Sequence, residues 1–238
     1  AEQPMALIES ERNGRVTIVR MNRPKKMNAV NQALAWGVLE AIKAAQADEE
    51  TWVIGLTGTG PAFCAGLDLA AANEADGSGM SEQDSYLDDL GWVSRFLFTL
   101  REECDKPIVC GINGVAVGAG LALALGGDIK IMAASARLMA GYPRIGASPD
   151  GGLSYTLGES MGYEQAMRFL LENRTVLGEE ALKLGMVGEV VSDEAFPARF
   201  EEYCQQIAKI SPITGRSTKR VLRNATRHQD LQAHLRYE

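Results

Sequence analysis

Two glycine-containing segments carry the backbone groups best suited to chemistry. In residues 61–68, Gly66 frees the chain so that the amide of Leu67 can point into a cleft. In residues 114–120, the amide of Ala119 opens a predicted helix, and helix N-termini offer unpaired N–H groups to a developing oxyanion. Each segment taken singly is more typical of tight packing between a strand and a helix than of a binding site.

Several familiar kinds of site are disfavoured by the residues present. The only histidines, His228 and His234, are six positions apart and do not share a helix face, which argues against a metal site. The sequence has no G-x-S-x-G elbow for a nucleophilic serine. The 114–120 segment matches neither a phosphate-binding loop nor a G-x-G-x-x-G dinucleotide fingerprint. Nucleophilic hydrolysis and nucleotide binding are therefore weak interpretations.

The charge balance and the apolar runs restrict the partners. Lys and Arg number 24 against 31 Asp and Glu, so a net charge of −7 would repel nucleic acid. Apolar runs such as 115–125 are too short to cross a bilayer and are broken by glycine, so we expect no membrane partner. The cysteines are far apart and follow no signal peptide, which favours reduced thiols and a cytoplasmic location.

The elements that must position the two segments alternate between strands and helices, which predicts an α/β fold. We expect strands at 15–20, 52–56, 107–112, 128–132 and 186–191. We expect helices at 31–46 with Asn31 as N-cap, and at 87–100, 121–125, 163–172, 179–184, 194–210 and 212–225. The small, polar and acidic stretch 70–85 is predicted to be a mobile loop or a lid.

Longer stretches carry a more specific pattern than either segment alone. They are NRPKKMNA at 22–29, GPAFCAGLDL at 60–69, KPIVCGINGVAVGAGL at 106–121, GGDIKI at 126–131, PDGG at 149–152, NR at 173–174 and EEALKLGMV at 179–187. In this order along almost the whole chain, they resemble the crotonase (enoyl-CoA hydratase/isomerase) family.

The resemblance implies a crotonase-like spiral of β-β-α units over residues 5–190 and a helical C-terminal region over 191–238, assembled as a homotrimer or homohexamer. It implies an acyl-CoA thioester substrate, as in fatty acid metabolism, and no cofactor beyond the coenzyme A that the substrate carries. The thioester oxygen would be held by the amides of Leu67 and Ala119, each of which can be worth roughly 3 kcal/mol. Substrate contacts would come from Lys26, Met27, Ala29, Ala65, Gly66, Asp68, Leu69, Gly118 and Tyr142.

The sequence departs from the family at its catalytic acids. Hydratases of the family use two glutamates, and the matching positions hold Ala122 and Arg144, neither of which can activate water. Asp150 is the remaining acid at a position that several isomerases and the aryl-CoA dehalogenases use. The dehalogenase histidine, however, falls at Arg95. A structural alternative is that Asp150 sits in a polar turn and caps the next helix, as Asp68 also could.

The favoured hypothesis is an enoyl-CoA isomerase in which the two amides hold an enolate and Asp150 moves a proton between carbons. The alternatives are a hydratase, lyase or thioester hydrolase of the same family, and a non-catalytic acyl-CoA binding protein.

Overall fold

The computed structural model describes residues 6–74, 91–225 and position 232. Its strands form two sheets. The larger has the order β1-β2-β3-β5-β7-β9, in which β1 runs antiparallel to β2 and every other pairing is parallel. These strands are Ile8–Asn13, Val16–Met21, Val53–Gly58, Ile108–Ile112, Ile129–Ala133 and Glu189–Val191. The smaller sheet is parallel and contains β4 (Ala62–Cys64), β6 (Val115–Val117) and β8 (Leu138–Met139).

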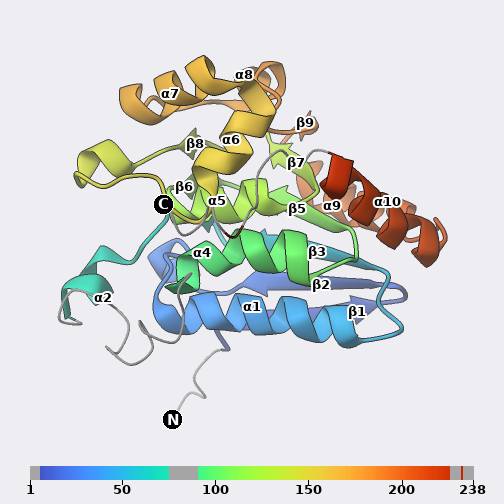
Figure 1. The fold of residues 1–238 in the computed structure, drawn as a ribbon. Helices are drawn as coiled ribbons and strands as arrows, with labels where there is room; N and C mark the ends of the chain where they lie inside the picture. Colours follow the sequence, from blue (N-terminus) through green and yellow to red (C-terminus); the bar gives the residue numbers. More distant parts are fainter. Residues whose placement is uncertain (1–5, 75–90, 226–231, 233–238) are drawn as a thin grey trace, which may run out of the picture.

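The chain winds as a spiral in which a strand of the large sheet is followed by a short strand of the small sheet and then by a helix. This unit occurs as β3-β4 followed by α4 (Gly91–Phe98), β5-β6 followed by α5 (Ala119–Gly126) and β7-β8 followed by α6 (Leu153–Met161). The predicted spiral of β-β-α units is therefore present. The short strands of the three units pair with one another in the order β4-β6-β8. The chain segments that follow these strands therefore start from one small sheet, of which Figure 1 labels β6 and β8.

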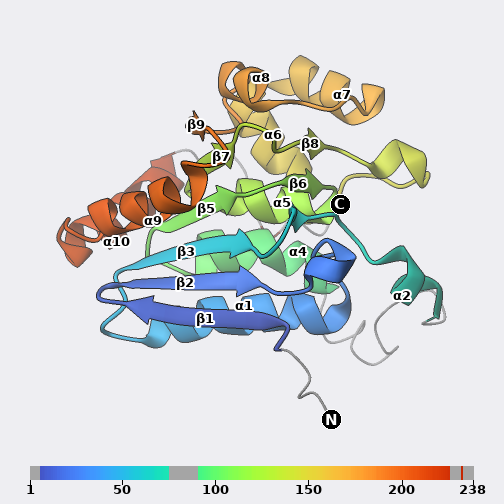
Figure 2. The same ribbon diagram turned by 180° about the vertical axis from the view of Figure 1, so that it is seen from behind.

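Helices cover both faces of the large sheet. Figure 2 shows α9 (Phe196–Ile207) in front of the sheet and α4 and α1 (Gln32–Ala47) behind it, while α10 (Pro212–Ala225) lies to one side, next to α9. Phe200 of α9 fits over two glycines of neighbouring strands: a Cβ at Gly55 or Gly111 would lie 2.9 or 2.7 Å from its ring. The remaining helices are α2 (Leu69–Glu74), α7 (Tyr163–Glu172) and α8 (Gly178–Lys183), with short turns η1 (Pro24–Lys26), η2 (Thr99–Glu103) and η3 (Tyr142–Arg144).

Helix α10 is attached to the core through a buried lysine. Lys219 Nζ lies 2.8 Å from Asp128 Oδ2 and donates to the carbonyl oxygens of Leu100 and Lys106 at 2.7 and 3.1 Å. A buried cation with three partners is stable because its desolvation is compensated, so these contacts fix α10 against η2 and β5.

Several sequence predictions need correction. The two glycine-containing segments, 61–68 and 114–120, contain the short strands β4 and β6, which were not among the predicted strands. Strands β1 and β8 and helix α6 were not predicted. Asn31 is the N-cap of α1 as expected, because its Oδ1 accepts from the Leu34 N–H at 2.9 Å. Of the expected mobile stretch at 70–85, residues up to 74 belong to α2, and the rest lies outside the described residues. Among the helices that the structure describes, none is long and apolar enough to span a membrane.

Candidate active site

The segment around Val30 and the segment around Leu67 lie side by side. The N–H of Val30 donates to the Gly66 carbonyl at 2.7 Å, and the N–H of Asp68 donates to the Val30 carbonyl at 2.8 Å. This is a parallel bridge between Val30 and Leu67. In such a bridge the intervening residue directs its N–H to the opposite side. The Leu67 amide therefore points away from Val30, toward the edge at which β4 pairs with β6.

Two glycines bring that edge into backbone contact with the start of α5. Gly66 has φ +93°, and a Cβ there would lie 2.8 Å from the Val117 carbonyl oxygen. A Cβ at Gly120 would lie 2.2 Å from the Cys64 carbonyl oxygen. Both distances are too short for any side chain, so glycine is required at each position.

The second amide opens α5. Gly118 is the N-cap, with φ 53° and ψ −120°, and its carbonyl accepts the first bond of the helix, from the Ala122 N–H at 2.9 Å. The N–H groups of Ala119, Gly120 and Leu121 consequently have no acceptor within the helix. The amide of Ala119 thus lies beside the β4 edge from which the Leu67 amide projects. Two donors at a helix N-terminus suit an oxygen that gains negative charge.

The turn at 149–152 folds tightly against the adjacent helices. Gly151 has φ +64°, and a Cβ there would be 2.9 Å from the Ala122 Cβ. Gly152 has φ +81°, and a Cβ there would be 2.3 Å from the Leu97 Cδ2. Because neither glycine carries a side chain, the turn lies directly on α5 and α4 and places Asp150 next to the start of α5.

Asp150 is held by a tyrosine rather than serving as the N-cap of α6. The N-cap of α6 is Gly152. Asp150 Oδ1 accepts a hydrogen bond from Tyr142 Oη at 2.7 Å. The Tyr142 ring also lies beside Gly118, since a Cβ at Gly118 would be 3.8 Å from Tyr142 Cζ. A carboxylate and the Ala119 end of α5 are thus joined through one buried phenol.

Asp68 is occupied by partners of its own. Arg23 lies 3.0 Å from its Oδ2, and the N–H of Ala71 donates to its Oδ1 at 3.3 Å, so Asp68 also caps α2 as the sequence suggested. Burial alone would raise the pKa of Asp68, but the bonds from Arg23 and Ala71 outweigh it and lower the pKa below its usual value. The positioning role of Arg23 was missed, although it stands in the 22–29 motif.

Two asparagines that the sequence analysis passed over fix the turn between β3 and β4. The fully buried Asn28 donates from Nδ2 to the Thr59 and Ala62 carbonyls at 2.9 Å, and its Oδ1 accepts from the Arg23 N–H at 2.8 Å. Asn113 donates to the Gly60 and Ala62 carbonyls at 3.0 and 3.1 Å. A buried asparagine with several backbone partners holds irregular chain because each lost bond leaves a buried polar group unpaired.

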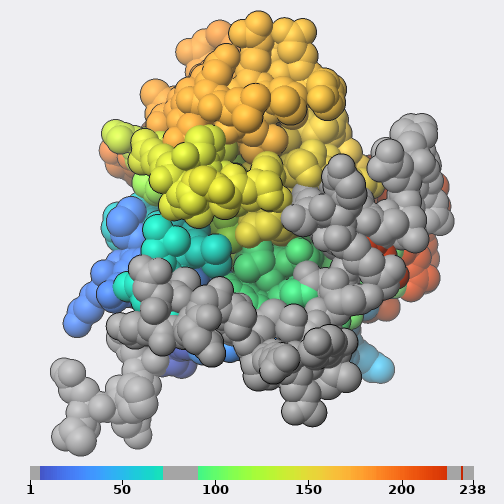
Figure 3. All heavy atoms as spheres, turned by 60° about the vertical axis from the view of Figure 1, so that its left-hand side comes forward, coloured from blue at the N-terminus to red at the C-terminus, as the bar shows by residue number. Residues whose placement is uncertain are grey.

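The predicted contact residues outside the bridge differ in exposure, and Gly118 and Tyr142 are buried. Lys26, Met27 and Leu69 are exposed, whereas Ala29 and Ala65 are half-buried. Figure 3 shows the cyan surface near residues 65–70 adjoining the yellow-green surface near 140–150. The structure thus brings the 26–29, 65–69, 118–119 and 142–150 parts of the predicted site together.

Thiol and metal chemistry gain no support from the described residues. All four cysteines are buried and free of disulfides: Cys64, Cys104, Cys110 and Cys204. Burial raises the pKa of Cys64 to about 12, so its thiol stays protonated and behaves as a small apolar group. In the parts of the chain that the structure describes, no three His, Cys, Asp or Glu side chains gather where they could hold a metal ion.

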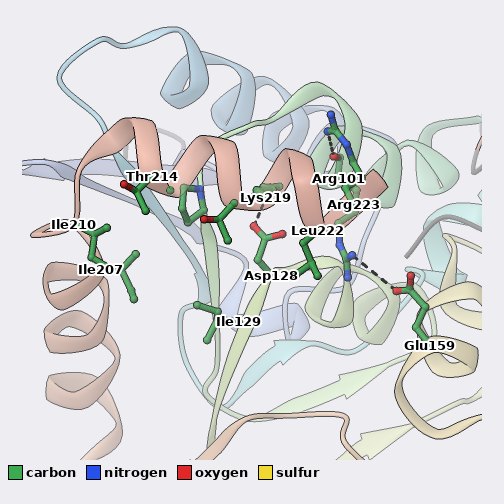
Figure 4. A pocket seen from close by; sticks show the side chains of 13 residues that line it. Arg101, Asp128, Ile129, Glu159, Ile207, Ile210, Thr214, Lys219, Leu222 and Arg223 are labelled. Atoms are coloured by element: carbon green, nitrogen blue, oxygen red, sulfur yellow. Dashed lines mark hydrogen bonds and ion pairs between the residues drawn. The ribbon is translucent and has the colours of Figure 1, made fainter. Parts of the chain in front are cut away.

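A pocket of about 740 Å³ lies away from these residues, between α10, the end of α9 and β7 (Figure 4). Ile129, Ile207 and Leu222 supply apolar lining, and Arg101 lies 3.8 Å from Glu159 at one end. Lys219 and Asp128 pair at its floor. The β4–α5 edge is a better candidate than this pocket, because its described residues combine backbone donors with an adjacent carboxylate.

Comparison with known proteins identifies the family of the chain. The family model described as enoyl-CoA hydratase/isomerase matches residues 11–238. The 1,2-epoxyphenylacetyl-CoA isomerase of Escherichia coli is 34% identical over 81% of this chain and 72% of its own length. A probable mitochondrial enoyl-CoA hydratase of Dictyostelium discoideum is 32% identical over 96% of this chain and 79% of its own. A solved enoyl-CoA hydratase/isomerase from Pseudoalteromonas atlantica superposes with a TM-score of 0.85 at 29% identity, covering 98% of this chain and 88% of that one.

The contact between Gly120 and β4 can be tested by adding one methyl group. We expect Gly120→Ala to lower the free energy of unfolding by about 1–3 kcal/mol, because the new Cβ meets a backbone oxygen that cannot rotate away. Gly158→Ala is the matched control: a Cβ there meets nothing within 4 Å, so its helix α6 should be unchanged or slightly stabilised. Urea denaturation measures both, and equal midpoints for the two variants would contradict the close contact.

Proposed function

This chain belongs to the enoyl-CoA hydratase/isomerase family, and we propose that within it the protein is an isomerase that moves the double bond of an unsaturated acyl-CoA thioester. The observation that carries the proposal is the Asp150 carboxylate, held at 2.7 Å by Tyr142 beside the start of α5. A relative named as an acyl-CoA isomerase and one named as a hydratase match at similar identity, so the choice between these activities rests on the side chains of the site.

In the proposed reaction the amides of Leu67 and Ala119 bind the thioester carbonyl oxygen. Removal of a proton from the carbon next to the thioester moves negative charge onto that oxygen, which the two donors stabilise more than they stabilise the ground state. The apolar helix α5 behind them excludes water and strengthens their effect.

Asp150 supplies the proton transfer. For a 3-enoyl-CoA its carboxylate takes a proton from C2, the double bond shifts from C3–C4 to C2–C3, and the same carboxyl returns the proton to C4. Atoms and charge balance with no other reactant. One acid–base group is sufficient because the proton that leaves is the proton that returns.

The positions of the two hydratase glutamates support this choice. Ala122 is buried against Gly151 and has no proton acceptor. Arg144 is exposed at the end of η3, and its guanidinium offers hydrogen-bond donors but no proton acceptor. Activation of water therefore has no carboxylate at either place.

Coenzyme A is proposed to bind across the bridged segments. Lys26, Met27 and Leu69 provide a cation and exposed apolar surface beside the Leu67 amide, and Ala29 and Ala65 leave room for the pantetheine arm. We propose no separate cofactor. Four free, buried cysteines suit the reducing cytoplasm that we propose as the location.

Replacement of Asp150 by asparagine separates a catalytic role from a structural one. Asparagine keeps the size and accepts the Tyr142 hydrogen bond, but it cannot take up a proton. We expect Asp150→Asn to bind 3-hexenoyl-CoA with little change and to lose about 10²- to 10⁴-fold in the rate of its conversion to 2-hexenoyl-CoA. Mass spectrometry in D₂O would follow both isomerisation and exchange at C2.

The matched control is Asp193→Asn, because Asp193 accepts a backbone N–H from Ser135 at 2.9 Å on the surface outside the site. It should retain full activity. An equal rate of isomerisation in Asp150→Asn and the wild type would show that Asp150 is only a turn residue. Tight binding without turnover of any thioester in a panel of acyl groups would instead favour the non-catalytic binding protein.

Hydration provides the contrast with the other common activity of the family. We expect crotonyl-CoA to be hydrated slowly or not at all, because neither Ala122 nor Arg144 can activate water. Loss of absorbance of the conjugated thioester reports the reaction. Turnover at about 10 per second or faster, as in ordinary enzymes, would refute the single-carboxylate mechanism.

We further propose that the protein assembles as a trimer or a hexamer. Tyr163, Met167 and Leu171 recur at every fourth residue on one side of α7 and are 82%, 38% and 68% exposed. An apolar stripe of this kind favours contact with a second copy. Light scattering at micromolar concentration should give three or six times the 25.7 kDa of the chain, and Leu171→Lys should weaken the assembly. A monomeric wild type would contradict the proposal.

A further inference from the structure

One buried side chain, Tyr142, contacts the proposed base, Asp150, and also the backbone next to the proposed oxyanion-binding amide of Ala119. Tyr142 is 5% exposed and donates from Oη to Asp150 Oδ1 at 2.7 Å. Its ring lies against Gly118, the residue before Ala119: a Cβ at Gly118 would be 3.8 Å from Tyr142 Cζ and 3.9 Å from Oη. The phenol therefore spans the distance between the carboxylate and the backbone that carries the second amide.

The backbone on which Tyr142 sits is itself tied down. The preceding Gly141 has φ +82°, and a Cβ there would lie 2.7 Å from the Val117 Cγ1, so the chain passes directly over β6. The N–H of Gly141 donates to Asn173 Oδ1 at 2.7 Å. Downstream, the Tyr142 carbonyl accepts from the N–H groups of Ile145 and Ala147 at 3.1 and 3.2 Å. A side chain with few rotamers on a fixed backbone is suited to set a position.

We propose that Tyr142 is a positioning residue that fixes the Asp150 carboxylate relative to the Ala119 amide and keeps it ionised for proton abstraction. This inference rests on the proposed isomerase function. The ring of Tyr142 sets the separation of carboxylate and amide, and its O–H favours the charged form of the carboxylate through a charge-assisted bond. Because the thioester oxygen is held by the amide, that separation decides which carbon of the acyl chain meets the base.

Tyr142→Phe removes the donor and keeps the ring beside Gly118. Without this bond the carboxylate is no longer held at a fixed distance from the Ala119 amide. Misplacement of a reacting group by about 1 Å can cost about 100-fold, so we expect kcat for 3-hexenoyl-CoA to fall by about 10- to 100-fold. KM should stay within about twofold, because Tyr142 acts on the base and not on the coenzyme A. The acidic limb of the pH–rate profile should move upward by about one pH unit, since the carboxylate loses a donor that favours its ionised form.

The shift can be assigned to Tyr142 because the neighbouring titratable groups are the same in both proteins. Helix α5, which packs against the turn of Asp150, carries no charged side chain. Among the residues that the structure describes, the other titratable groups on the elements packed around that turn are Arg95 on α4, Arg144 on η3, and Tyr155 and Glu159 on α6.

Tyr203→Phe is the matched control, because it makes the same chemical change on α9, at a ring that packs against Arg199 outside the site. It should leave kcat and the pH profile as in the wild type. Urea denaturation of Tyr142→Phe shows whether folding is affected, and the kinetic comparison is made well below its midpoint. The double variant Tyr142→Phe with Asp150→Asn should be no slower than Asp150→Asn alone, because Tyr142 acts through Asp150.

The outcomes distinguish the two proposals. If Asp150→Asn is inactive while Tyr142→Phe has wild-type kcat and an unmoved acidic limb, the positioning role is wrong and the isomerase function stands. An additive loss in the double variant would also overturn it, because Tyr142 would then act independently of the carboxylate. If Asp150→Asn is fully active, the proposed function itself fails.

Discussion

The structure of the site depends on one constraint, which is backbone contact between β4 and the segment that leads into α5. A Cβ at Gly114 would lie 2.0 Å from the Pro61 carbonyl oxygen, and one at Gly120 would lie 2.2 Å from the Cys64 oxygen. Gly66 makes the reciprocal contact with Val117. Contacts of this kind leave no side chain that could adjust, so the amides that follow Gly66 and Gly118 keep a fixed relation. Preorganised donors of this kind need no rearrangement when charge develops on a bound oxygen.

The charges of the protein are placed so that they do not compete with these amides. Every residue of α5 is apolar and buried, so the polarity at its N-terminus comes from backbone N–H groups alone. The buried cations lie elsewhere and bind the backbone: Lys106 Nζ donates to the Ala45 and Asp48 carbonyls at 2.7 and 2.6 Å, and Lys219 holds α10. Burial lowers the pKa of Lys106, which its carbonyl partners do not reverse. The buried ammonium groups therefore hold the fold together at a distance from α5, while the polarity at the start of α5 comes from backbone dipoles.

The sequence predicted best those elements whose pattern lies within the element itself, and it missed contacts between residues that are distant along the chain. The bounds of α7 and α10 agree with the prediction because their apolar residues recur with helical period, and α7 ends at Asn173, which adopts the left-handed conformation. Strands β4, β6 and β8 have two or three residues each, too few for an alternating pattern, and their pairing joins distant parts of the chain. The two glycine segments could be found from sequence, but the bond from Tyr142 to Asp150 could not, because it depends on how η3 packs over β6. Arg23 and Asn28 were missed for the same reason, since their partners lie in other segments.

The packing of one alanine brings the acid of the turn to the start of α5. A Cβ at Gly151 would be 2.9 Å from the Cβ of Ala122, so residues 149–152 lie directly against this helix. In that position Tyr142 holds the Asp150 carboxylate beside Gly118. Addition of water needs one group to activate the water and another to supply a proton, whereas one carboxylate can both remove and return a proton in a double-bond shift. The single carboxylate of Asp150 is therefore the reason for proposing the second reaction.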